Sequence, residues 1–368
     1  MMGALFLIFA FAMELSQKTD QQWISRCFDL AKRGIGYVSP NPPVGAVLVH
    51  NDGIIGEGFH PVFGGPHAEV EAFGSVPENK RHLLPESILY VSLEPCCIYA
   101  KTPPCTDLII REGVRKVRIS ALDPNPKIAG RGIDILRQHG IEATTGILEE
   151  KGRDLIRMFR TNILFERPHV ILKWAQSANG YIGQKDERIM LSHPYTNTWS
   201  HGMRSAVDAI MVGARTVMTD DPKLTTRDAP GRSPHRAVYD PNGFLKRNYQ
   251  VFEENGTRVF YFSVAENPGL NGEHIMQFKL NDSSSHIDQM LVYLYAQQIG
   301  SLMVEGGAHL LNLFIKEHKW NEGWVIRTKH ALDNGIQAPN ITGQLIQQIE
   351  SATDMITGIM NEKIEMKI

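Results

Sequence analysis

A histidine, two cysteines and a glutamate occur at spacings that could build a catalytic metal site. His67 and Glu69 are two residues apart, Pro95 directly precedes Cys96, and Cys105 comes nine residues after Cys96. One imidazole and two thiolates leave the fourth position of a tetrahedral zinc ion open to water, as in catalytic zinc sites. A carboxylate beside that water can take its proton and deliver it to a leaving group. These residue types therefore indicate hydrolysis by a zinc-activated water.

The order of these residues indicates which hydrolysis. His-x-Glu followed by Pro-Cys is typical of zinc deaminases that act on nucleobases. We predict that His67, Cys96 and Cys105 bind zinc, which would lower the pKa of the bound water towards about 7, and that Glu69 is the general acid–base and not a ligand. Cys97 is an alternative ligand, although the motif places the thiolate directly after the proline. The nine-residue spacing replaces the short Pro-Cys-x-x-Cys loop of other deaminases.

The composition describes a globular protein of two domains. The chain has 368 residues, of which 42% are hydrophobic and 21% charged, enough for two domains of ordinary size. The net charge of -2 gives no attraction to a phosphodiester backbone, so we expect no nucleic-acid partner. Three of the four cysteines lie between residues 96 and 105, which indicates a metal site in a reducing compartment, and so a cytoplasmic location. Cys27 is interpreted as a buried structural residue.

Residues 1–12 are almost wholly apolar. They lack the basic start and the small-residue cleavage site of a secretory signal, and they are far shorter than the roughly 20 residues that span a bilayer. We interpret them as the product of an upstream start codon, with Met13 as the true or alternative beginning. A short membrane-associating tail is the other interpretation. We expect no membrane partner.

The first half of the chain alternates strands with helices, which predicts a largely parallel, three-layer α/β sheet. Residues 51–53 (NDG) predict a tight hairpin turn. A proline is tolerated in the first turn of a helix, so Cys96 is expected at a helix N-terminus, where the helix dipole favours a thiolate. The expected strands are 44–50, 54–60, 87–93, 116–121 and 141–146, and the expected helices begin near 67 and cover 132–138 and 148–165.

A second α/β domain follows Arg167 and Pro168. No G-x-G-x-x-G follows its first strand, so a Rossmann dinucleotide site is not supported. The tail from about residue 333 is polar and weakly periodic, and no role is assigned to it. The predicted division is an apolar extension at 1–20, a deaminase domain at 21–166 and a second domain at 167–368. The expected strands of the second domain are 169–175, 209–212, 237–240, 258–263, 301–305 and a last one at 323–328, and its helices cover 194–204 and 287–298 and begin at 308.

Several segments of the first domain resemble the bifunctional riboflavin-biosynthesis enzymes, in which a pyrimidine deaminase is fused to a uracil reductase. They are residues 40–47 (PNPPVGAV), 94–96 (EPC), 101–105 (KTPPC), 123–126 (DPNP) and 130–132 (GRG). The resemblance implies a cytidine-deaminase-like fold. It also implies that Asn41, Lys101, Asp123 and Asn125 contact the substrate, with Lys101 near the ribose phosphate. Without the family, Lys101 is equally well a solvated loop charge.

The resemblance continues through the second domain and covers residues 23–328. Its segments are 173–177 (KWAQS), 201–204 (HGMR), 208–213 (DAIMVG), 216–227 (TVMTDDPKLTTR) and 303–307 (MVEGG). It implies a dihydrofolate-reductase-like fold that uses NADPH. The implied cofactor contacts are Ala175, Thr216, Asp220, Gly307, Ala308 and His309. The implied substrate contacts are Lys173, Arg204, Leu224, Arg227 and Glu305.

The chemistry of these side chains agrees with the resemblance, although each has a plainer alternative. Gly306 and Gly307 lie between a predicted strand and helix, where backbone N–H groups could hold a cofactor phosphate; the alternative is a structural turn. Arg204 and Arg227 suit bidentate phosphate contact, whereas isolated arginines are more often surface residues. Lys173 could orient or polarise the reacting sugar, or extend to solvent from a strand end.

The chain departs from the family pattern at four places. Cys97 and Ile98 stand where the family has Ser-His, and Ala100 replaces a glycine. Residues 177–180 read Ser-Ala-Asn-Gly instead of Ser-Leu-Asp-Gly, which keeps the turn and loses a charge. Residues 190–192 read Met-Leu-Ser instead of Trp-Ile-Thr/Ser, so an aromatic that stacks on the cofactor is absent. We expect these changes to affect rate and affinity more than reaction type.

The resemblance implies two reactions on a phosphorylated pyrimidine, a small-molecule partner. They are zinc-dependent hydrolytic deamination of 2,5-diamino-6-(5-phosphoribosylamino)pyrimidin-4(3H)-one, then NADPH-dependent reduction of its ribosyl group to ribityl. We also expect a homo-oligomer. One rival, a tRNA or nucleoside deaminase with an appended domain, predicts a basic surface and the short zinc loop. A second rival is a non-catalytic, zinc-stabilised binding protein, which would tolerate the loss of Glu69.

Overall fold

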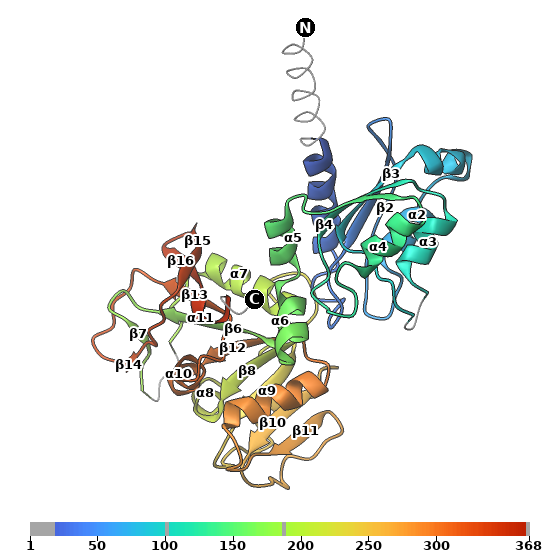
Figure 1. The fold of residues 1–368 in the computed structure, drawn as a ribbon. Helices are drawn as coiled ribbons and strands as arrows, with labels where there is room; N and C mark the ends of the chain where they lie inside the picture. The colour runs from blue at the N-terminus through green and yellow to red at the C-terminus, as the bar shows by residue number, and fades with distance from the viewer. Residues whose placement is uncertain (1–18, 100–102, 186–188, 366–368) are drawn as a thin grey trace. The chain divides into compact units, whose positions relative to one another are not determined.

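The computed structural model describes residues 19–99, 103–185 and 189–365. The chain divides into two compact units, residues 1–164 and residues 165–368 (Figure 1). The apolar segment 1–12 and the predicted substrate contact Lys101 lie outside the described residues. Within the described residues, every helix is too short or too polar to cross a bilayer.

The first unit is built on a five-stranded sheet in the order β2-β1-β3-β4-β5. Strand β1 is antiparallel to β2 and β3, whereas β3, β4 and β5 are parallel. The predicted hairpin at 51–53 is confirmed, whereas the expected parallel arrangement is found only for β3, β4 and β5, because β1 is also antiparallel to β3. Asn51 and Asp52 take the left-handed backbone conformation that such a turn requires (φ 45° and 59°). The strands are β1 (Gly45–His50), β2 (Gly53–Phe59), β3 (Ile88–Leu93), β4 (Lys116–Ala121) and β5 (Glu142–Thr144).

Helices cover both faces of this sheet, because successive strand side chains point to opposite faces. One face packs on α2 (Ala68–Gly74), α3 (Cys105–Arg111) and α4 (Arg131–Gln138). The opposite face packs on the helix at residues 19–32, which contributes the buried Cys27, and on α5 (Glu149–Leu155). A short 3-10 helix, η1 (Glu78–Glu86), leads into β3.

The expected single helix at 148–165 is two helices. Helix α5 ends before Ile156, which has φ -100° and ψ 15°, and α6 (Arg157–Phe165) begins after it. Ile156 is almost fully buried at this break. Gly152 of α5 is so close to β4 that a Cβ there would lie 2.4 Å from Ser120 Oγ. Packing on the sheet therefore overrides the continuous helical periodicity of the sequence.

The second unit has a nine-stranded sheet in the order β11-β10-β9-β8-β12-β6-β13-β16-β15. From β11 to β13 in this order, each strand is parallel to its neighbour. Strand β16 is antiparallel to β13, and β15 is antiparallel to β16. The strands are β6 (His169–Gln176), β8 (Ala209–Gly213), β9 (His235–Tyr239), β10 (Val259–Ser263), β11 (Ile275–Lys279), β12 (Ser301–Gly306), β13 (Glu322–Arg327), β15 (Gln344–Ser351) and β16 (Asp354–Met360), while β7 (Tyr181–Gly183) pairs with β14 (Ile336–Gln337).

Helices α9 and α10 pack against one face of this sheet and bury Trp174, Phe260 and Phe262 in its main apolar core. Helix α7 lies between β7 and β8 in the chain, and α8 directly follows β8 (Figure 1). The helices are α7 (Pro194–Ala206), α8 (Ala214–Asp220), α9 (His286–Ala296), α10 (Ala308–Lys316) and α11 (Glu362–Glu365), with a 3-10 turn, η2 (Gln250–Phe252).

The polar tail forms part of the second sheet. The expectation that residues 323–328 are the last strand is wrong, because β16 pairs with β13 and β15 covers the outer edge of β16. Most of β15 is exposed, which explains its polar sequence. Gly358 of β16 lies against Trp324, where a Cβ would come within 2.8 Å of the indole ring. A strand that needs glycine for close packing has a weak sequence signal.

Candidate active sites

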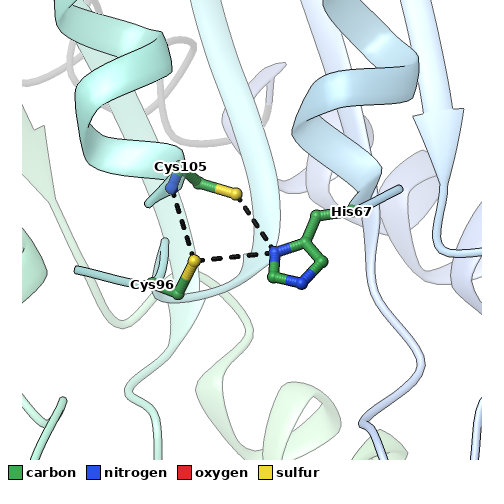
Figure 2. Close-up of side chains that lie close together, drawn as sticks. All are labelled: His67, Cys96 and Cys105. Carbon is green, nitrogen blue, oxygen red and sulfur yellow. Dashed lines mark hydrogen bonds between the residues drawn. The ribbon is translucent and has the colours of Figure 1, made fainter. Parts of the chain in front are cut away.

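Three side chains distant in the sequence converge in the first unit to form a candidate metal site. Figure 2 shows the side chains of His67, Cys96 and Cys105 pointing toward one another. His67 Nδ1 lies 3.3 Å from Cys105 Sγ and 3.5 Å from Cys96 Sγ. The three ligand atoms all lie within 4.8 Å of one another. Zinc–nitrogen and zinc–sulfur bond lengths require such atoms to be roughly 3.5 to 3.8 Å apart in a tetrahedral site. The predicted donor set therefore fits one zinc ion.

Each ligand is placed at the end of a regular element. His67 caps α2 through its backbone, Cys96 follows β3, and Cys105 is the first residue of α3, after Pro104. The prediction that Cys96 begins a helix is wrong, because its segment is irregular. The helix begins at Cys105, whose backbone N–H donates to Cys96 Sγ at 3.3 Å. The first residue of α3 thus donates a backbone hydrogen bond to Cys96 across the loop.

The hydrogen bonds between the ligands favour a thiolate at Cys96 before any metal binds. The side-chain hydrogen bond from the Cys105 thiol is the main cause that brings the pKa of Cys96 down to about 4; burial opposes this effect, and His67 and the Cys105 backbone N–H reinforce it. The same side-chain hydrogen bond, together with burial, raises the pKa of Cys105. The metal-free pair therefore shares one proton, with the charge on Cys96. Cys97 is not in the group of potential ligands found among the described residues, so it is not supported as a ligand.

Glu69 lies in the first turn of α2, next to the metal ligand His67, and is only 3% exposed. In the metal-free protein burial raises the pKa of Glu69 to about 6; Cys96 raises it further, and His67 opposes the rise. A carboxyl group with a pKa near neutrality can both accept and donate a proton at physiological pH. Its position and its protonation behaviour suit the predicted general acid–base.

Asn41 is held by a histidine that the sequence reasoning missed. Asn41 Nδ2 lies 3.0 Å from His60 Nε2, and His60 Nδ1 lies 2.7 Å from the Pro66 carbonyl oxygen. Because a carbonyl oxygen only accepts, Nδ1 of the neutral ring carries the proton and Nε2 accepts from the Asn41 amide. Asn41 Oδ1 therefore faces away from His60. His60 ends the second predicted strand, and only the fold brings it to Asn41.

Asp123 and Asn125 are held close to the metal loop by a second residue that the sequence reasoning missed. The buried Glu94 accepts backbone N–H groups from Asp123 at 3.3 Å, and from Gly130 and Gly132 at 3.0 Å each. The Asp123 carboxylate accepts the backbone N–H of Asn125 at 2.8 Å. Burial raises the pKa of Asp123 to about 6, opposed by the hydrogen bond from Asn125 and aided by Glu94 and Cys96.

A second cluster lies in the second unit, around Glu305 near the carboxyl end of β12. Arg204 of α7 donates to both carboxylate oxygens, from Nε at 3.1 Å and from Nη2 at 2.6 Å. Lys173 Nζ of β6 lies 3.8 Å from Glu305 Oε1. Burial alone would raise the pKa of Glu305, but Arg204 and Lys173 outweigh it and hold the pKa at about 2. Burial lowers the pKa of Lys173, and Glu305 opposes that effect.

The loop after α8 joins this cluster. Arg204 Nη1 donates to the Thr225 carbonyl at 3.2 Å, and the Arg227 backbone N–H donates to His201 Nδ1 at 3.2 Å. The Arg227 side chain is 53% exposed, whereas that of Arg204 is 13% exposed. Leu224 is buried in a left-handed backbone conformation (φ 54°). The fold thus gathers the predicted substrate residues Lys173, Arg204, Arg227 and Glu305 in one region; His201 was not predicted as part of it.

The predicted cofactor residues lie at the start of α10, on the neighbouring helix α8 and on strand β6. Gly307 caps α10, no side chain caps this helix, and Ala308 and His309 are its first residues. Their backbone N–H groups belong to the first turn, which suits a phosphate. A Cβ on Gly307 would lie 3.1 Å from Thr216 Oγ1 of α8, so these two residues are neighbours. Asp220 ends α8, and Ala175 lies on β6 two residues after Lys173.

The departure at Asn179 has a structural explanation. Its Oδ1 accepts the Leu332 N–H at 3.1 Å, and its Nδ2 donates to the Leu332 carbonyl at 2.7 Å. An aspartate carboxylate would supply only the first of these bonds. The amide therefore fastens the turn before β7 to the chain at residue 332.

Met190, where the family has an aromatic residue, is 65% exposed.

Comparisons with known proteins assign a family to each part of the chain. Residues 17–121 match the model of the cytidine and deoxycytidylate deaminase zinc-binding region, and residues 168–326 match that of the RibD C-terminal domain. Fold and sites thus define a deaminase domain joined to a reductase domain. The chain belongs to the family of riboflavin biosynthesis protein RibD and is a bifunctional deaminase and reductase of riboflavin biosynthesis. The predicted family and fold class are confirmed.

The relatives match over most of their length. The Aquifex aeolicus protein is 36% identical, over 82% of this chain and 84% of its own. The Actinobacillus pleuropneumoniae protein is 34% identical, over 92% and 91%. The crystal structure of a diaminohydroxyphosphoribosylaminopyrimidine deaminase/5-amino-6-(5-phosphoribosylamino)uracil reductase from Thermotoga maritima is 35% identical, covers 94% of this chain and 99% of its own, and has a TM-score of 0.87. Acinetobacter baumannii RibD is 30% identical over the same shares, with a TM-score of 0.84.

Proposed function

We propose that the first unit deaminates 2,5-diamino-6-(5-phosphoribosylamino)pyrimidin-4(3H)-one and that the second unit then reduces the ribosyl group of the product to ribityl with NADPH. The observation that carries this proposal is the convergence of His67, Cys96 and Cys105 around one metal position beside the buried Glu69. The name of the Thermotoga maritima relative, which states both activities and a phosphoribosylaminouracil, supports the choice of substrate.

In the deaminase step the residues of this chain bind the pyrimidine and move protons. His67, Cys96 and Cys105 would hold zinc, which when bound lowers the pKa of a water molecule towards neutrality. Glu69 would take a proton from water and deliver it to the amino group, so that one water is consumed, ammonia leaves and a carbonyl replaces the amine. Asn41 presents Oδ1 to the base because His60 fixes its amide. Asp123, held by Glu94, and Asn125, whose backbone N–H donates to Asp123, complete the pyrimidine contacts, and the family resemblance assigns Lys101 to the phosphate.

In the reductase step the charged cluster binds and orients the phosphorylated sugar. Arg227, which is half exposed, binds the phosphate, and Leu224 packs against the substrate. Arg204 directs three of its N–H groups to Glu305 and the Thr225 carbonyl and so holds Glu305 in place. The other N–H groups of its guanidinium contact the phosphate. Glu305 contacts the substrate, and Lys173 orients the sugar.

The cofactor side of the reductase lies at the start of α10 and along the neighbouring helix α8. The first-turn amides at Gly307, Ala308 and His309 would hold a phosphate of NADPH, and Ala175, Thr216 and Asp220 complete its contacts. NADPH, when bound, supplies the hydride that reduces the sugar. We further propose that the enzyme is a cytoplasmic homo-oligomer. The free thiols of all four cysteines support a reducing compartment.

The test uses the full-length protein with the diaminopyrimidinone ribosylamine phosphate as substrate. We expect ammonia release, followed by NADPH oxidation that depends on the deaminated product. Glu69→Gln should abolish ammonia release, whereas Glu71→Gln, on the same turn of α2, should retain it. Zinc binding without ammonia release would indicate the non-catalytic binding protein. Deamination of tRNA or free nucleosides, but not of this phosphate, would indicate the other rival.

A further inference from the structure

His201 lies beside the charged cluster around Glu305 and contacts two of its arginines, Arg204 and Arg227. It lies on α7 one turn before Arg204 and is only 3% exposed. Its Nδ1 faces the backbone nitrogen of Arg227 at 3.2 Å. Its Nε2 lies 3.2 Å from Asp228 Oδ2 and 3.4 Å from Arg204 Nη1. One ring therefore touches both the loop that carries Arg227 and the arginine that holds Glu305.

These neighbours determine where the ring proton lies. A backbone N–H can only donate, so Nδ1 must be the acceptor and the proton of the neutral ring is on Nε2. Nε2–H then donates to the Asp228 carboxylate. Arg204 Nη1 also has only donors, and it makes its hydrogen bond with the Thr225 carbonyl instead. Burial lowers the pKa of His201; Arg204 and Arg227 lower it further, while Asp228 and Glu305 oppose. The neutral ring is thus consistent with the geometry.

The two hydrogen bonds fix the loop at two consecutive residues. The first holds the backbone of Arg227 and the second holds the side chain of Asp228, which also lies 3.9 Å from Arg227 Nε. The Arg227 side chain is 53% exposed, and that of Asp228, which lies 3.9 Å from Arg227 Nε, is 49% exposed. The hydrogen bond from the Arg227 backbone N–H to the buried His201 ring on α7 fixes the backbone position from which the guanidinium extends.

We propose that His201 is a positioning residue of the reductase, which aims Arg227 at the phosphate of the substrate by accepting the Arg227 backbone N–H. This inference rests on the proposed function, in which Arg227 binds that phosphate. His201 itself does not touch the substrate. Its effect is therefore confined to the affinity for a phosphorylated substrate and does not extend to the cofactor.

Three substitutions separate the two hydrogen bonds of the ring. An asparagine Oδ1 replaces the Nδ1 acceptor, a glutamine Nε2 replaces the Nε2 donor, and leucine replaces neither. In the full-length protein, NADPH oxidation is measured with the deaminated phosphoribosylaminouracil. His201→Leu and His201→Gln should raise KM for this substrate about tenfold, which is the scale of one lost buried hydrogen bond. His201→Asn should restore most of that loss. His318→Asn, the same change at an exposed histidine of the second unit, is the matched control.

Further readouts distinguish positioning from loss of structure. KM for NADPH and the melting temperature should be the same for the Asn and Gln variants, although their KM values for the substrate differ. With the dephosphorylated substrate the effect of His201→Leu should vanish. Arg227→Ala should raise KM for the phosphorylated substrate, and the combination with His201→Leu should be less than additive.

Each failure has its own meaning. If Arg227→Ala raises KM and the His201 variants do not, the positioning proposal is overturned and the proposed function stands. If Arg227→Ala leaves KM unchanged, the phosphate assignment within the proposed function fails. If His201→Asn has the same raised KM for the substrate as His201→Gln, His201 is only structural and the proposal is overturned. The same conclusion follows if the variants raise KM for the substrate and KM for NADPH together.

Discussion

Glu305 is expected to stabilise the second unit through its buried ion pairs with Arg204 and Lys173. Its carboxylate is 10% exposed, and its pKa is held at about 2, against an ordinary value of 4.5. At about 1.4 kcal/mol per pKa unit, this difference corresponds to about 3 kcal/mol of folding free energy at neutral pH. Glu305→Gln leaves two buried cations without a counter-charge, so we expect it to lower the free energy of unfolding by about 3 kcal/mol.

Urea unfolding followed by tryptophan fluorescence measures this change. Of the five tryptophans, only Trp23 lies in the first unit, so the signal reports mainly the second. Because the folded pKa of Glu305 is lowered, its contribution is complete above pH 4.5 and is lost as the pH falls towards 2. The difference between wild type and variant should therefore be constant from pH 7 to 5 and shrink below 4.5. Glu254→Gln, an exposed site in the same unit, is the control.

Two results would refute this reasoning. One is a decrease in the free energy of unfolding of Glu305→Gln by less than about 1 kcal/mol at pH 7, because removing one partner of a buried ion pair costs several times more. The other is a difference that grows as the pH falls. The variant Arg204→Met should also be destabilised, and its combination with Glu305→Gln should cost less than the two single changes together.

Three further substitutions probe the two sites. Cys96→Ser should remove zinc and abolish ammonia release while NADPH oxidation with added deaminated product persists; metal analysis and both assays check this. Gly132→Ala places a Cβ 2.4 Å from the Pro95 carbonyl oxygen and 3.2 Å from Glu94 Oε1. It should therefore displace the metal loop and lower the melting temperature of the first unit. A wild-type melting temperature together with a wild-type KM of the deaminase would contradict the close packing. Gly307→Ala brings a Cβ to 3.1 Å from Thr216 Oγ1, so KM for NADPH should rise severalfold with little change in stability, whereas an unchanged KM would remove Gly307 from the cofactor site.

The sequence predicted the features that depend on local chemistry. The hairpin at 51–53 follows from residues that tolerate a left-handed backbone, and the strands of the parallel core follow from short apolar runs. The metal ligands were found because His67, Cys96 and Cys105 have few other uses at that spacing. The side chains of Lys173, Arg204 and Glu305 were identified only through a family resemblance, and the fold then brought them together.

The features that the sequence did not reveal depend on tertiary contacts. His60, Glu94 and His201 act as hydrogen-bond acceptors for groups 19 or more residues away, and no local pattern marks such partners. Pro95 and Pro104 are equally compatible with a helix start, and only the fold selects the second. The strand β16 was missed because Gly358, which its packing on Trp324 requires, weakens the strand signal.

Ammonia release per bound zinc, compared between the wild type and Glu69→Gln, tests the central claim most directly. Both proteins are loaded with zinc, their metal content is measured, and each is given the diaminopyrimidinone ribosylamine phosphate. The account predicts about one zinc per chain in both, with ammonia release reduced by roughly two to four orders of magnitude in the variant. Equal release by the two proteins, or a zinc-loaded wild type that releases none, would contradict it.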